Sequence, residues 1–304
     1  MKVPAILYIS AFALFSGCAD EQPESPKQRV VVVGDIHADI IVARRAFQLA
    51  GAIDEQGEWV GGDLVVVQLG DFIGRSYEDR EVLDFILEVR NKAEVGGGNV
   101  HVLIGNHEVF GARLELRWVP DEAYSAFSDI PGLDLNNPRL MHLPEYQRAR
   151  SAALMPGGYY SKQLAEFPAV LRLGETIYVH GGVTPHWARY GVDRINEEVS
   201  KWFAGHSDEP VSAQGMDPRN HDDSVMMSRH FSEDVDEKDC EMLEESLALL
   251  NAKRMIVAHS IQQSITARCD DQVWAVDVGM SRYYGGNLQV LQIIDDDIVS
   301  VIEY

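Results

Sequence analysis

Five stretches of this 304-residue sequence share one pattern, in which a run of apolar, mostly β-branched residues ends in a polar residue beside a glycine or an alanine. They are 30–37 (VVVVGDIH), 64–71 (LVVVQLGD), 100–108 (VHVLIGNHE), 176–182 (TIYVHGG) and 254–260 (RMIVAHS). Nearly continuous apolar runs of this length are typical of strands that are buried on both faces of a sheet. We therefore expect these five strands to form the centre of the protein.

Two amphipathic helices are expected between the first three strands. Apolar residues recur there at helical spacing: Ile40, Ala43, Phe47 and Ala50 in one segment, and Val82, Leu83, Ile86 and Val89 in the next. Gly51 marks the end of the first helix, because glycine accepts the backbone angles that follow a helix. Strands that alternate with helices are typical of an α/β fold.

The pattern changes near the C-terminus. The segments 273–278 (VWAVDV), 288–294 (LQVLQII) and 298–303 (IVSVIE) are separated by short polar turns. Such a series predicts a closing set of neighbouring, antiparallel strands.

Two long segments, 111–170 and 191–236, show no clean periodicity, although both are rich in aromatic, proline and charged residues. We expect loops and short helices over one end of the sheet, as is usual for long functional loops.

The composition excludes some partners. A hydrophobic content of 46% can fill a large core, so the chain is long enough for one large domain or two small ones. The formal charge of −22 argues against a nucleic-acid groove and against attraction to anionic lipid, because both require an excess of Lys and Arg. An anionic substrate would need bound cations to attract it.

The first 18 residues, MKVPAILYISAFALFSGC, have the features of an export signal: one lysine, an apolar run and small residues before a cysteine. Ser16, Gly17 and Cys18 resemble a bacterial lipoprotein cleavage box, in which Cys18 carries the lipid. The alternatives are an ordinary signal peptide or a short anchor. Residues 19–29 then form a polar tether. We expect a lipid-anchored protein of the bacterial cell envelope that faces the periplasm or the cell surface.

Two cysteines remain once Cys18 is set aside. Cys240 and Cys269 could form a disulfide, because an exported protein meets oxidising conditions. Cys240 also fits an apolar helix face with Leu243 and Leu247, so a buried free thiol is the alternative.

Polar residues of ligand type follow the five predicted strands. They are Asp35, His37, Asp71, Asn106, His107, His180 and His259. Ligands of open α/β sheets bind beyond the carboxyl ends of strands, so these ends can converge. Carboxylate, imidazole and amide donors without cysteine suit Mn, Fe or Zn. Each residue alone is more simply a turn former or a structural histidine, but five coincidences favour a metal site.

The spacing of the first two of these residues gives a further expectation. Asp35 and His37 are two positions apart, so in an extended chain both side chains point the same way.

The ordered blocks GDIHAD, GDFIGR, GNHE, HGG and AHS resemble those of the calcineurin-like metallophosphoesterases. Within that superfamily, WVGGDLVVVQLGD, SRHFSEDVDEKDC and AVDVGMSRYYGG are most similar to the phosphoprotein-phosphatase branch and its bacterial Shewanella-like type. The resemblance covers 30 to about 294. It implies two mixed β-sheets in a sandwich flanked by helices, within one domain at 30–304 that carries insertions at about 111–170 and 191–236.

The resemblance also implies a role for each site residue. Asp35, His37 and Asp71 would bind one metal, Asp71 would bridge to the second, and Asn106, His180 and His259 would complete that second site. Two divalent cations, Mn before Fe or Zn, activate water and clamp the phosphate. His107 would protonate the leaving oxygen, while Arg75 and Arg229 would hold the phosphate. The alternative for Arg229 is a surface ion pair with Glu233 or Asp234.

The chain departs from the family at Gly74, where relatives place an aspartate that supports the catalytic histidine. Its absence predicts weaker proton donation by His107. Asp39 or Glu108 could replace it, although both are also plausible loop-capping carboxylates. On this interpretation Gly74→Asp should strengthen the hydrolysis of alkyl phosphates.

The sequence thus predicts a two-metal phosphomonoesterase that acts on phosphorylated protein or on a small phosphate ester. The resemblance favours a protein phosphatase with a lean toward phosphotyrosine. One alternative is a nucleotide or small-molecule phosphohydrolase, because the metal centre does not select the alcohol. Another is a pseudophosphatase that keeps its metals and binds phosphorylated partners without turnover. No nucleic acid is expected, and the membrane is contacted through the anchor only.

Overall fold

The computed structural model describes residues 28–214 and 224–304. The predicted signal peptide with Cys18, and all but the last two residues of the tether, lie outside these ranges. Within them, no helix is long and apolar enough to cross a membrane.

Two mixed five-stranded sheets form the centre of the molecule. The first has the order β10-β9-β1-β2-β3 and contains β1 (Arg29–Val33), β2 (Val65–Gln68), β3 (Asn99–Val102), β9 (Gln289–Ile294) and β10 (Ile298–Glu303). The second has the order β4-β5-β6-β8-β7 and contains β4 (Val170–Leu173), β5 (Thr176–Val179), β6 (Arg254–Val257), β7 (Thr266–Arg268) and β8 (Val273–Ala275). The predicted architecture is therefore confirmed.

The five apolar runs form β1, β2, β3, β5 and β6, of which β3 lies at the edge of its sheet. β1, β2 and β3 are parallel in the first sheet, and β5 and β6 are parallel in the second. Every residue of β2, β5 and β6 is buried, as expected for strands that are covered on both faces. Because the strands of each parallel set point the same way, their carboxyl ends meet at one edge.

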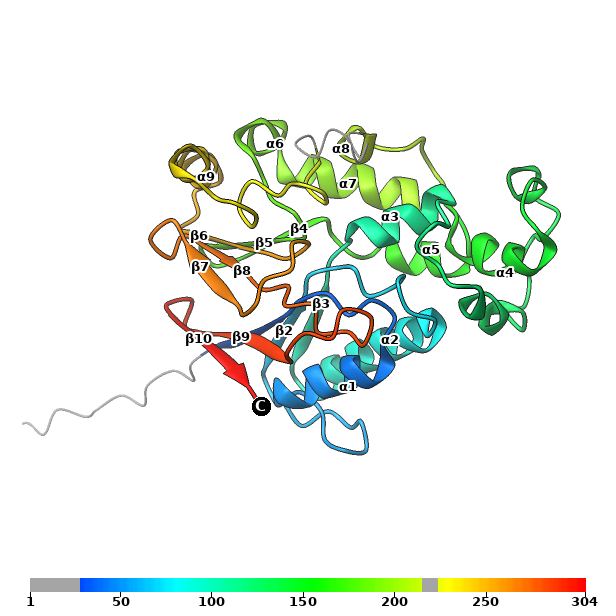
Figure 1. Cartoon of the computed structure of the whole chain (residues 1–304), viewed down its shortest axis with the longest axis horizontal. Coiled ribbons are helices and arrows are strands. Elements are labelled where there is room, and N and C mark those ends of the chain that lie inside the picture. The colour runs from blue at the N-terminus through cyan, green and yellow to red at the C-terminus, as the bar shows by residue number, and fades with distance from the viewer. Residues whose placement is uncertain (1–27, 215–223) are drawn as a thin grey trace, which may run out of the picture.

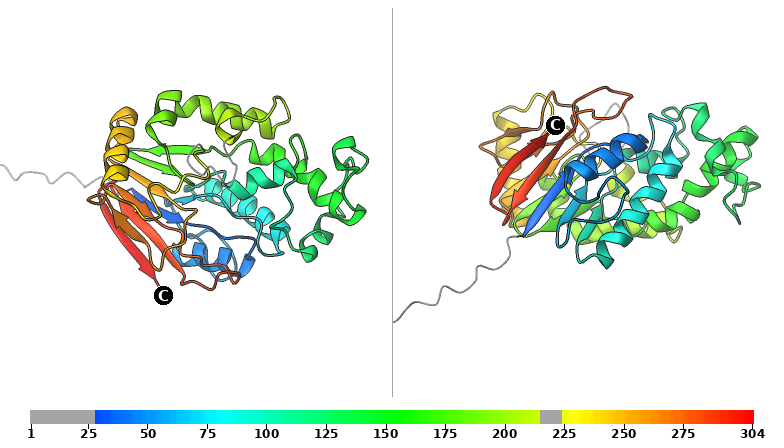
Figure 2. Two further views of the ribbon diagram at one scale, coloured as in Figure 1. Left: turned by 45° about the horizontal axis from the view of Figure 1, so that its top comes forward. Right: turned by 90° about the horizontal axis from the view of Figure 1, so that it is seen from below.

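Helices cover the outer faces of the sheets, so the layers run helix, sheet, sheet, helix (Figure 1; Figure 2, left). The first sheet packs against α1 (Ile40–Leu49) and α2 (Asp79–Val95), as predicted. The helices of the second side are α6 (Pro185–Tyr190), α7 (Val192–Phe203) and α9 (Glu237–Leu250). Both views in Figure 2 place the segment around α4 at the end of the molecule away from β9 and β10.

That distant segment is built from short helices, as the sequence predicts for 111–170. It contains η1 (Asp121–Ala123), η2 (Ser125–Phe127), η3 (Pro138–Leu140), α4 (Glu145–Leu154) and α5 (Tyr159–Leu164). The remaining helices are α3 (Asn106–Arg113), which follows β3, and α8 (Val211–Gln214). That the segments at about 111–170 and 191–236 are insertions into one domain stays a prediction.

Two expectations about secondary structure are wrong. The C-terminal strands are not all neighbours: β9 and β10 form the expected antiparallel pair beside β1, whereas β8 pairs with β6 and β7 in the second sheet. An apolar run specifies a strand but not its partner. The segment 191–236 contains the 12-residue helix α7, which buries Ile195, Val199, Trp202 and Phe203. Its apolar residues recur about once per turn among charged ones, so the period is easily overlooked.

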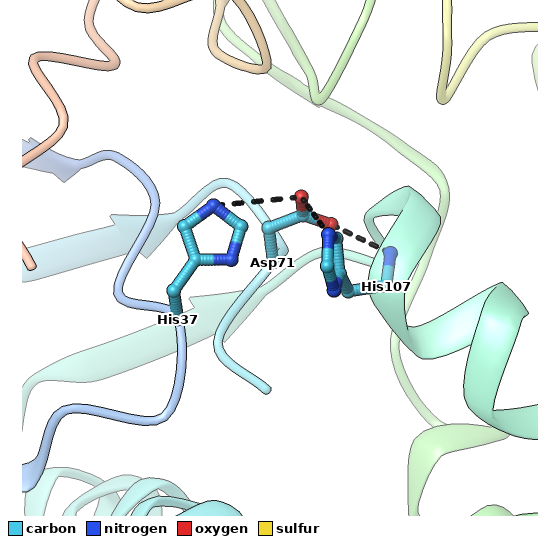
Figure 3. Close-up of side chains that lie close together, drawn as sticks. All are labelled: His37, Asp71 and His107. Carbon is cyan, nitrogen blue, oxygen red and sulfur yellow. Dashed lines mark hydrogen bonds and ion pairs between the residues drawn. The ribbon is translucent and has the colours of Figure 1, made fainter. Parts of the chain in front are cut away.

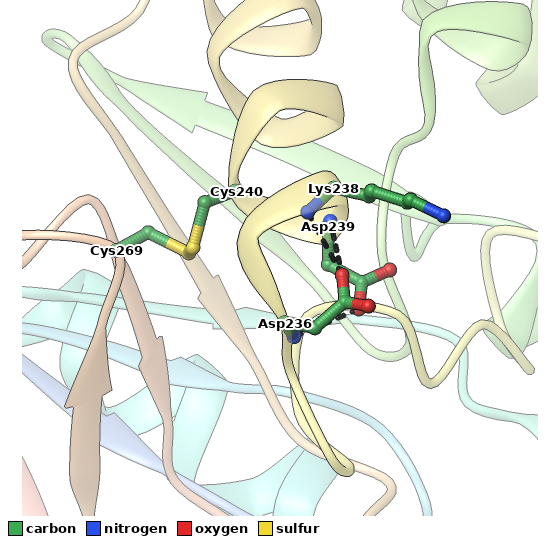
Figure 4. Close-up of a disulfide and its surroundings, with 5 residues drawn as sticks. All are labelled: Asp236, Lys238, Asp239, Cys240 and Cys269. Carbon is green, nitrogen blue, oxygen red and sulfur yellow. Dashed lines mark hydrogen bonds between the residues drawn. A yellow bond between two sulfur atoms is a disulfide. The ribbon is translucent and has the colours of Figure 1, made fainter.

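The structure joins Cys240 of α9 to Cys269, which follows β7, in a disulfide with a Cα–Cα distance of 5.3 Å (Figure 4). The free-thiol alternative is therefore wrong. The bond fastens α9 to the edge of the second sheet.

Candidate metal centre

All seven predicted residues converge at the carboxyl ends of β1, β2, β3, β5 and β6. Asp35 and His37 follow β1, Asp71 follows β2, His180 follows β5 and His259 follows β6, while Asn106 and His107 open α3 after β3. Apart from His259, each is at most 4% exposed. The sequence pattern thus placed the cluster correctly, although no observation tests the role of each residue.

Asp71 lies at the centre of this cluster. Figure 3 shows it between His37 and His107, and the Nε2 atom of each ring is 4.0 Å from Asp71 Oδ2. The other carboxylate oxygen, Oδ1, is 3.4 Å from His180 Nε2. One carboxylate therefore faces both ends of the cluster, as a bridging ligand must.

His180 is held in an orientation that suits a ligand. Its Nδ1 lies 2.8 Å from the Leu69 carbonyl oxygen, so Nδ1 carries the proton and donates it. In a neutral ring Nε2 is then an acceptor, and it lies 2.9 Å from Asn106 Oδ1, which is also an acceptor. Two acceptors at this distance need a proton or a cation between them. The nearby carboxylates of Asp71 and Asp35 outweigh burial and raise the pKa of His180 to about 9.

Several buried polar atoms of the cluster have no hydrogen-bond partner among the described residues. They are Asp35 Oδ1, His37 Nδ1 and His259 Nε2. Ligand atoms of Asp71, His180 and His259 all lie within 4.8 Å of one another, and so do those of His37, Asp71 and His107. Unsatisfied buried polar atoms are costly, and cations would satisfy them. The residues present therefore fit two divalent metal ions.

The local backbone differs from the expected extended chain. His37 and Asp71 both have φ 51°, and His259 has φ 67°, which are left-handed conformations. His37 Nε2 still comes within 3.6 Å of Asp35 Oδ2, but through a sharp turn and not through strand alternation. The expected geometry was wrong, whereas the expected proximity is confirmed.

Glu108 fixes the loop that carries Asp71. Its carboxylate accepts main-chain N–H groups of Asp71 at 2.9 Å, Phe72 at 3.1 Å and Gly105 at 2.8 Å. In return, the main-chain N–H of His107 donates to Asp71 Oδ1 at 2.8 Å. Glu108 is thus a capping carboxylate and does not support the ring of His107.

Asp39 is also occupied elsewhere. It caps α1 by accepting from Val42 N at 3.1 Å, and its second oxygen accepts from Arg282 N at 2.7 Å and Nε at 2.8 Å. Arg282 also contacts Glu78. The capping alternative is therefore confirmed for both carboxylates, and Asp39 anchors the segment that precedes Tyr283 and Tyr284.

Gly74 leaves no space for the aspartate that relatives carry. Its φ is +78°, and an added Cβ would lie 2.2 Å from His107 Nδ1. Such a side chain would displace the imidazole that it was expected to support. The expectation that Gly74→Asp strengthens proton donation is therefore corrected by the packing. Burial is the main reason that the pKa of His107 falls to about 3, and the charges of His37 and Arg75 act in the same direction.

A different carboxylate supports the Gly74 turn. Asp79, the first residue of α2, accepts the main-chain N–H of Gly74 at 2.7 Å and Arg150 Nε at 2.5 Å. Asp79 is 0% exposed and Arg150 is 1% exposed. This buried pair connects α4 of the distant segment to the loop that presents Arg75.

Arg75 and Arg229 both line a cavity of about 290 Å³ above the cluster, but in different states. The Arg75 guanidinium stacks on the ring of Trp118, 4.0 Å from the ring centroid, and no carboxylate of the described chain pairs with it. Arg229 is held by Glu233 at 3.1 Å and by Ser260 Oγ at 2.9 Å. The alternative ion pair with Glu233 is therefore present, even though Arg229 reaches the cavity.

Four further residues line the same cavity, and sequence analysis assigned none of them to the site. They are Glu233, Ile261, Asp277 and Tyr284. Asp277 could have been found, because it ends the apolar run 273–278 close to a glycine, as the other site residues do. The other three lie in loops without a comparable signal.

Comparison with known proteins adds a family and a fold. The family model for calcineurin-like phosphoesterases matches residues 28–263. Shewanella-like protein phosphatase 2 of Arabidopsis thaliana is 34% identical over 315 residues, which cover 93% of this chain and 78% of the relative. Shewanella-like protein phosphatase 1 of Plasmodium berghei is 23% identical over 281 residues, which cover 90% of this chain and 74% of the relative.

A solved structure has the same fold. The cold-active protein-tyrosine phosphatase of a psychrophilic Shewanella species superposes with a TM-score of 0.67 at 22% identity, and the match covers 91% of this chain and 80% of that one. At this identity the likeness concerns the fold alone.

Proposed function

The chain belongs to the calcineurin-like phosphoesterase family and is a metal-dependent phosphatase, and we propose that it acts on proteins phosphorylated on tyrosine. The observation that carries this proposal is the convergence of ligand-type side chains from five strand ends beneath a cavity that is lined by two arginines. The names of the relatives support action on phosphoproteins.

The proposed ligand sets follow the two halves of the cluster. Asp35, His37 and Asp71 hold one cation, and Asp71 with Asn106, His180 and His259 holds the second. Oxygen donors and imidazoles favour Mn²⁺, with Fe or Zn as the alternatives. Such cations, when bound, activate water and neutralise charge on the phosphoryl group.

The chain's own side chains bind the phosphate and protonate the leaving group. Arg75 binds phosphate oxygens through its unpaired, planar guanidinium, and Arg229, which lines the same cavity, assists. Water adds to phosphorus as the ester P–O bond breaks, and the leaving oxygen takes a proton from His107. The phosphate dianion in the cavity supplies the negative charge that favours protonated His107.

Aromatic side chains around Arg75 support the preference for phosphotyrosine. The Arg75 guanidinium carbon lies 5.7 Å from the ring centroids of both Tyr283 and Tyr284, in addition to its contact with Trp118. Tyr283 is 55% exposed, so its face is open to a substrate. A phosphate bound at Arg75 would bring the ring of phosphotyrosine against these faces, whereas phosphoserine would leave them uncovered.

The substrate preference is tested with Tyr283→Ala. An aromatic contact contributes about 0.5–1.5 kcal/mol, so the ratio of kcat/KM for phosphotyrosine and phosphothreonine peptides should fall about 2- to 10-fold. Tyr146→Ala is the matched control, because Tyr146 is 53% exposed but lines a different cavity, whereas Tyr283 contacts Arg75. An unchanged ratio in Tyr283→Ala would remove the support for aromatic recognition.

Turnover itself separates the remaining alternatives. Purified protein with Mn²⁺ should hydrolyse nitrophenyl phosphate and phosphotyrosine peptides, and a chelator should abolish both activities. A rate equal to that of metal-stripped protein would favour the pseudophosphatase. Faster hydrolysis of nucleotides than of phosphopeptides would favour the small-molecule enzyme.

We also propose that the protein is exported and lipid-anchored through Cys18. The Cys240–Cys269 disulfide supports an oxidising compartment. Cys18→Ala should release the protein from the membrane fraction. Mass analysis of the mature protein provides the check, and an unmodified Cys18 would contradict the proposed anchor.

A further inference from the structure

Asp277 is a third buried carboxylate at the edge where the metal ligands meet. It follows β8 (Val273–Ala275), is 1% exposed and lines the same cavity as His37 and Asp71. The strand ends that supplied the predicted ligands belong to β1, β2, β3, β5 and β6. β8 lies next to β6 in the second sheet and runs parallel to it, so its carboxyl end reaches the same edge.

Close packing of two chain segments brings Asp277 to Asp35. Gly34, which precedes Asp35, lies so near the β8 end that an added Cβ would be 2.7 Å from the Val276 carbonyl oxygen and 3.3 Å from Asp277 Cα. Only glycine permits this approach without moving a backbone. The two carboxylates are consequently neighbours, although they are far apart in the sequence.

The basic side chains beside the two carboxylates are imidazoles. The Asp277 carboxylate accepts the main-chain N–H of Gly279 at 2.8 Å. Asp35 faces His37 and His180, and within the described ranges no Lys or Arg pairs with Asp35 or Asp277. Adjacent buried carboxylates that no Lys or Arg pairs with share a proton or a cation.

We propose that Asp277 is an additional carboxylate ligand of the cation held by Asp35 and His37. This inference rests on the metal centre of the proposed function. It adds a negative charge to those of Asp35 and Asp71, so three carboxylates offset three of the four positive charges of two divalent cations. The centre keeps one excess positive charge for the phosphate.

The additional ligand makes the two metal positions chemically different. The first position then has three carboxylates and the imidazole of His37. The second has the Asp71 carboxylate, the Asn106 amide oxygen and two imidazoles. Carboxylate-rich sites suit hard cations such as Mn²⁺, whereas imidazole-rich sites suit Zn²⁺ and Fe. The first position should therefore hold Mn²⁺ in preference to Zn²⁺.

The first experiment measures Mn²⁺ binding to purified full-length protein and to Asp277→Asn. The wild type should bind two ions per chain. The variant keeps the size of the side chain and an acceptor for Gly279 N, so it should bind one ion as before and the other about 10- to 100-fold more weakly. Glu233→Gln is the control, because Glu233 lines the same cavity but pairs with Arg229, and it should bind both ions normally.

The outcomes separate this inference from the proposed function. A wild type that binds no Mn²⁺ would contradict the two-metal centre itself. A wild type that binds two ions, together with an Asp277→Asn variant that binds both with unchanged affinity, would overturn only the role of Asp277.

A second variant distinguishes a ligand from a residue that merely orients His37, and it remains informative if Asp277→Asn does not fold. Asp277→Cys places a thiolate at the same position, and Co²⁺ bound by that thiolate should give a sulfur-to-metal charge-transfer absorption. Wild-type protein with Co²⁺ is the reference for any signal from Cys18, since Cys240 and Cys269 are joined to each other. Stoichiometric Co²⁺ binding to folded Asp277→Cys without the new absorption would overturn the proposal.

Discussion

The two sheets contribute to the metal centre in different ways. The first sheet supplies Asp35 and Asp71, and Glu108 and Asp79 fix the Asp71 and Gly74 turns from within the same half of the molecule. The second sheet supplies imidazoles, and His180 is oriented by the Leu69 carbonyl, which belongs to the end of β2 in the first sheet. The Asp71 turn is therefore fixed within the first half, whereas the orientation of His180 depends on the first sheet.

The two arginines show the same contrast. On the side of the first sheet, Arg75 is stacked on Trp118 and its main-chain N–H donates to Trp118 O at 2.8 Å, so the side chain is positioned without a competing anion. On the other side, Arg229 shares its charge with Glu233. We therefore expect substrate binding to depend more on Arg75, on the side of the first sheet, than on Arg229, on the side of the second.

Substitution of Asp71, which faces both ligand sets, should have the largest effect on activity. Asp71→Asn removes the charge that faces both ligand sets, and asparagine tolerates the φ of 51° at this position. We expect kcat to fall about 1,000-fold or more, because several kcal/mol of electrostatic stabilisation are lost, and we expect the metal content to fall for both ions. Elemental analysis beside kinetics provides the check. Full activity in this variant would refute the two-metal assignment.

The buried Arg150–Asp79 pair tests how the first half is supported. Arg150→Met leaves the Asp79 charge buried and uncompensated, so the free energy of unfolding should fall by about 3–5 kcal/mol. Denaturant unfolding measures this loss. Arg148→Met, on the same helix but bonded only to the Leu143 carbonyl within the described residues, should cost about 0.5 kcal/mol.

A double variant identifies the cause of that loss. Asp79→Asn combined with Arg150→Met removes both charges and should recover much of the stability. If the double variant is no more stable than Arg150→Met, lost packing and not an unpaired charge explains the effect.

The two arginines can be compared directly. Arg75→Met should lower kcat/KM about 100-fold, since it removes charge-assisted hydrogen bonds of about 1.5–3 kcal/mol each. Arg229→Met should lower it only about 10-fold, because Glu233 already shares that guanidinium. Metal content should be unchanged in both variants. A larger loss for Arg229→Met would place the phosphate on the second sheet's side and reverse the comparison.

The contact between the sheets gives the smallest expected effect. Asp296, in the turn between β9 and β10, accepts from Thr176 Oγ1 at 2.6 Å and from Glu175 N at 2.8 Å, at the start of β5. Burial opposes ionisation, but these hydrogen bonds and the neighbouring Lys253 and Arg254 lower the pKa of Asp296. A lowered folded-state pKa gives stability that is present above the unfolded-state pKa, about 4, and is lost as the pH falls through the folded-state value.

Melting temperatures measure this effect. The difference in Tm between wild type and Asp296→Asn should be greatest at pH 6–7 and should shrink below about pH 4. A difference that is constant from pH 7 to pH 3 would show that the charge of Asp296 does not connect the sheets.

The sequence predicted the strand ends well, because a buried parallel strand and a polar residue at its end are both local patterns. Asp35, His180 and His259 are found in this way. Pairing between strands is not local, and for that reason the separation of β8 from β9 was missed. Asp277 follows the same local pattern, but that its strand end reaches the metal centre depends on the pairing of β8 with β6.

The geometry of the loops was also not predictable from the sequence. The missing aspartate at Gly74 suggested a defect that a substitution could repair, yet the imidazole of His107 occupies the space that a side chain would need. Similarly, Arg150 gave no signal as the partner of Asp79, 71 positions away. Such contacts depend on packing between distant segments, and periodicity carries no information about them.

The left-handed turns at His37 and His259 affect how the sequence can evolve at these two positions. At a φ of 51° or 67°, the backbone of a histidine is less stable than that of a glycine by about 1 kcal/mol. Replacing either by glycine should therefore relax the backbone while it removes a ligand, so the chain could become more heat-resistant as it loses chemistry. Natural selection for thermostability alone would favour glycine at these two positions. Only selection for the catalysed reaction would keep the histidines.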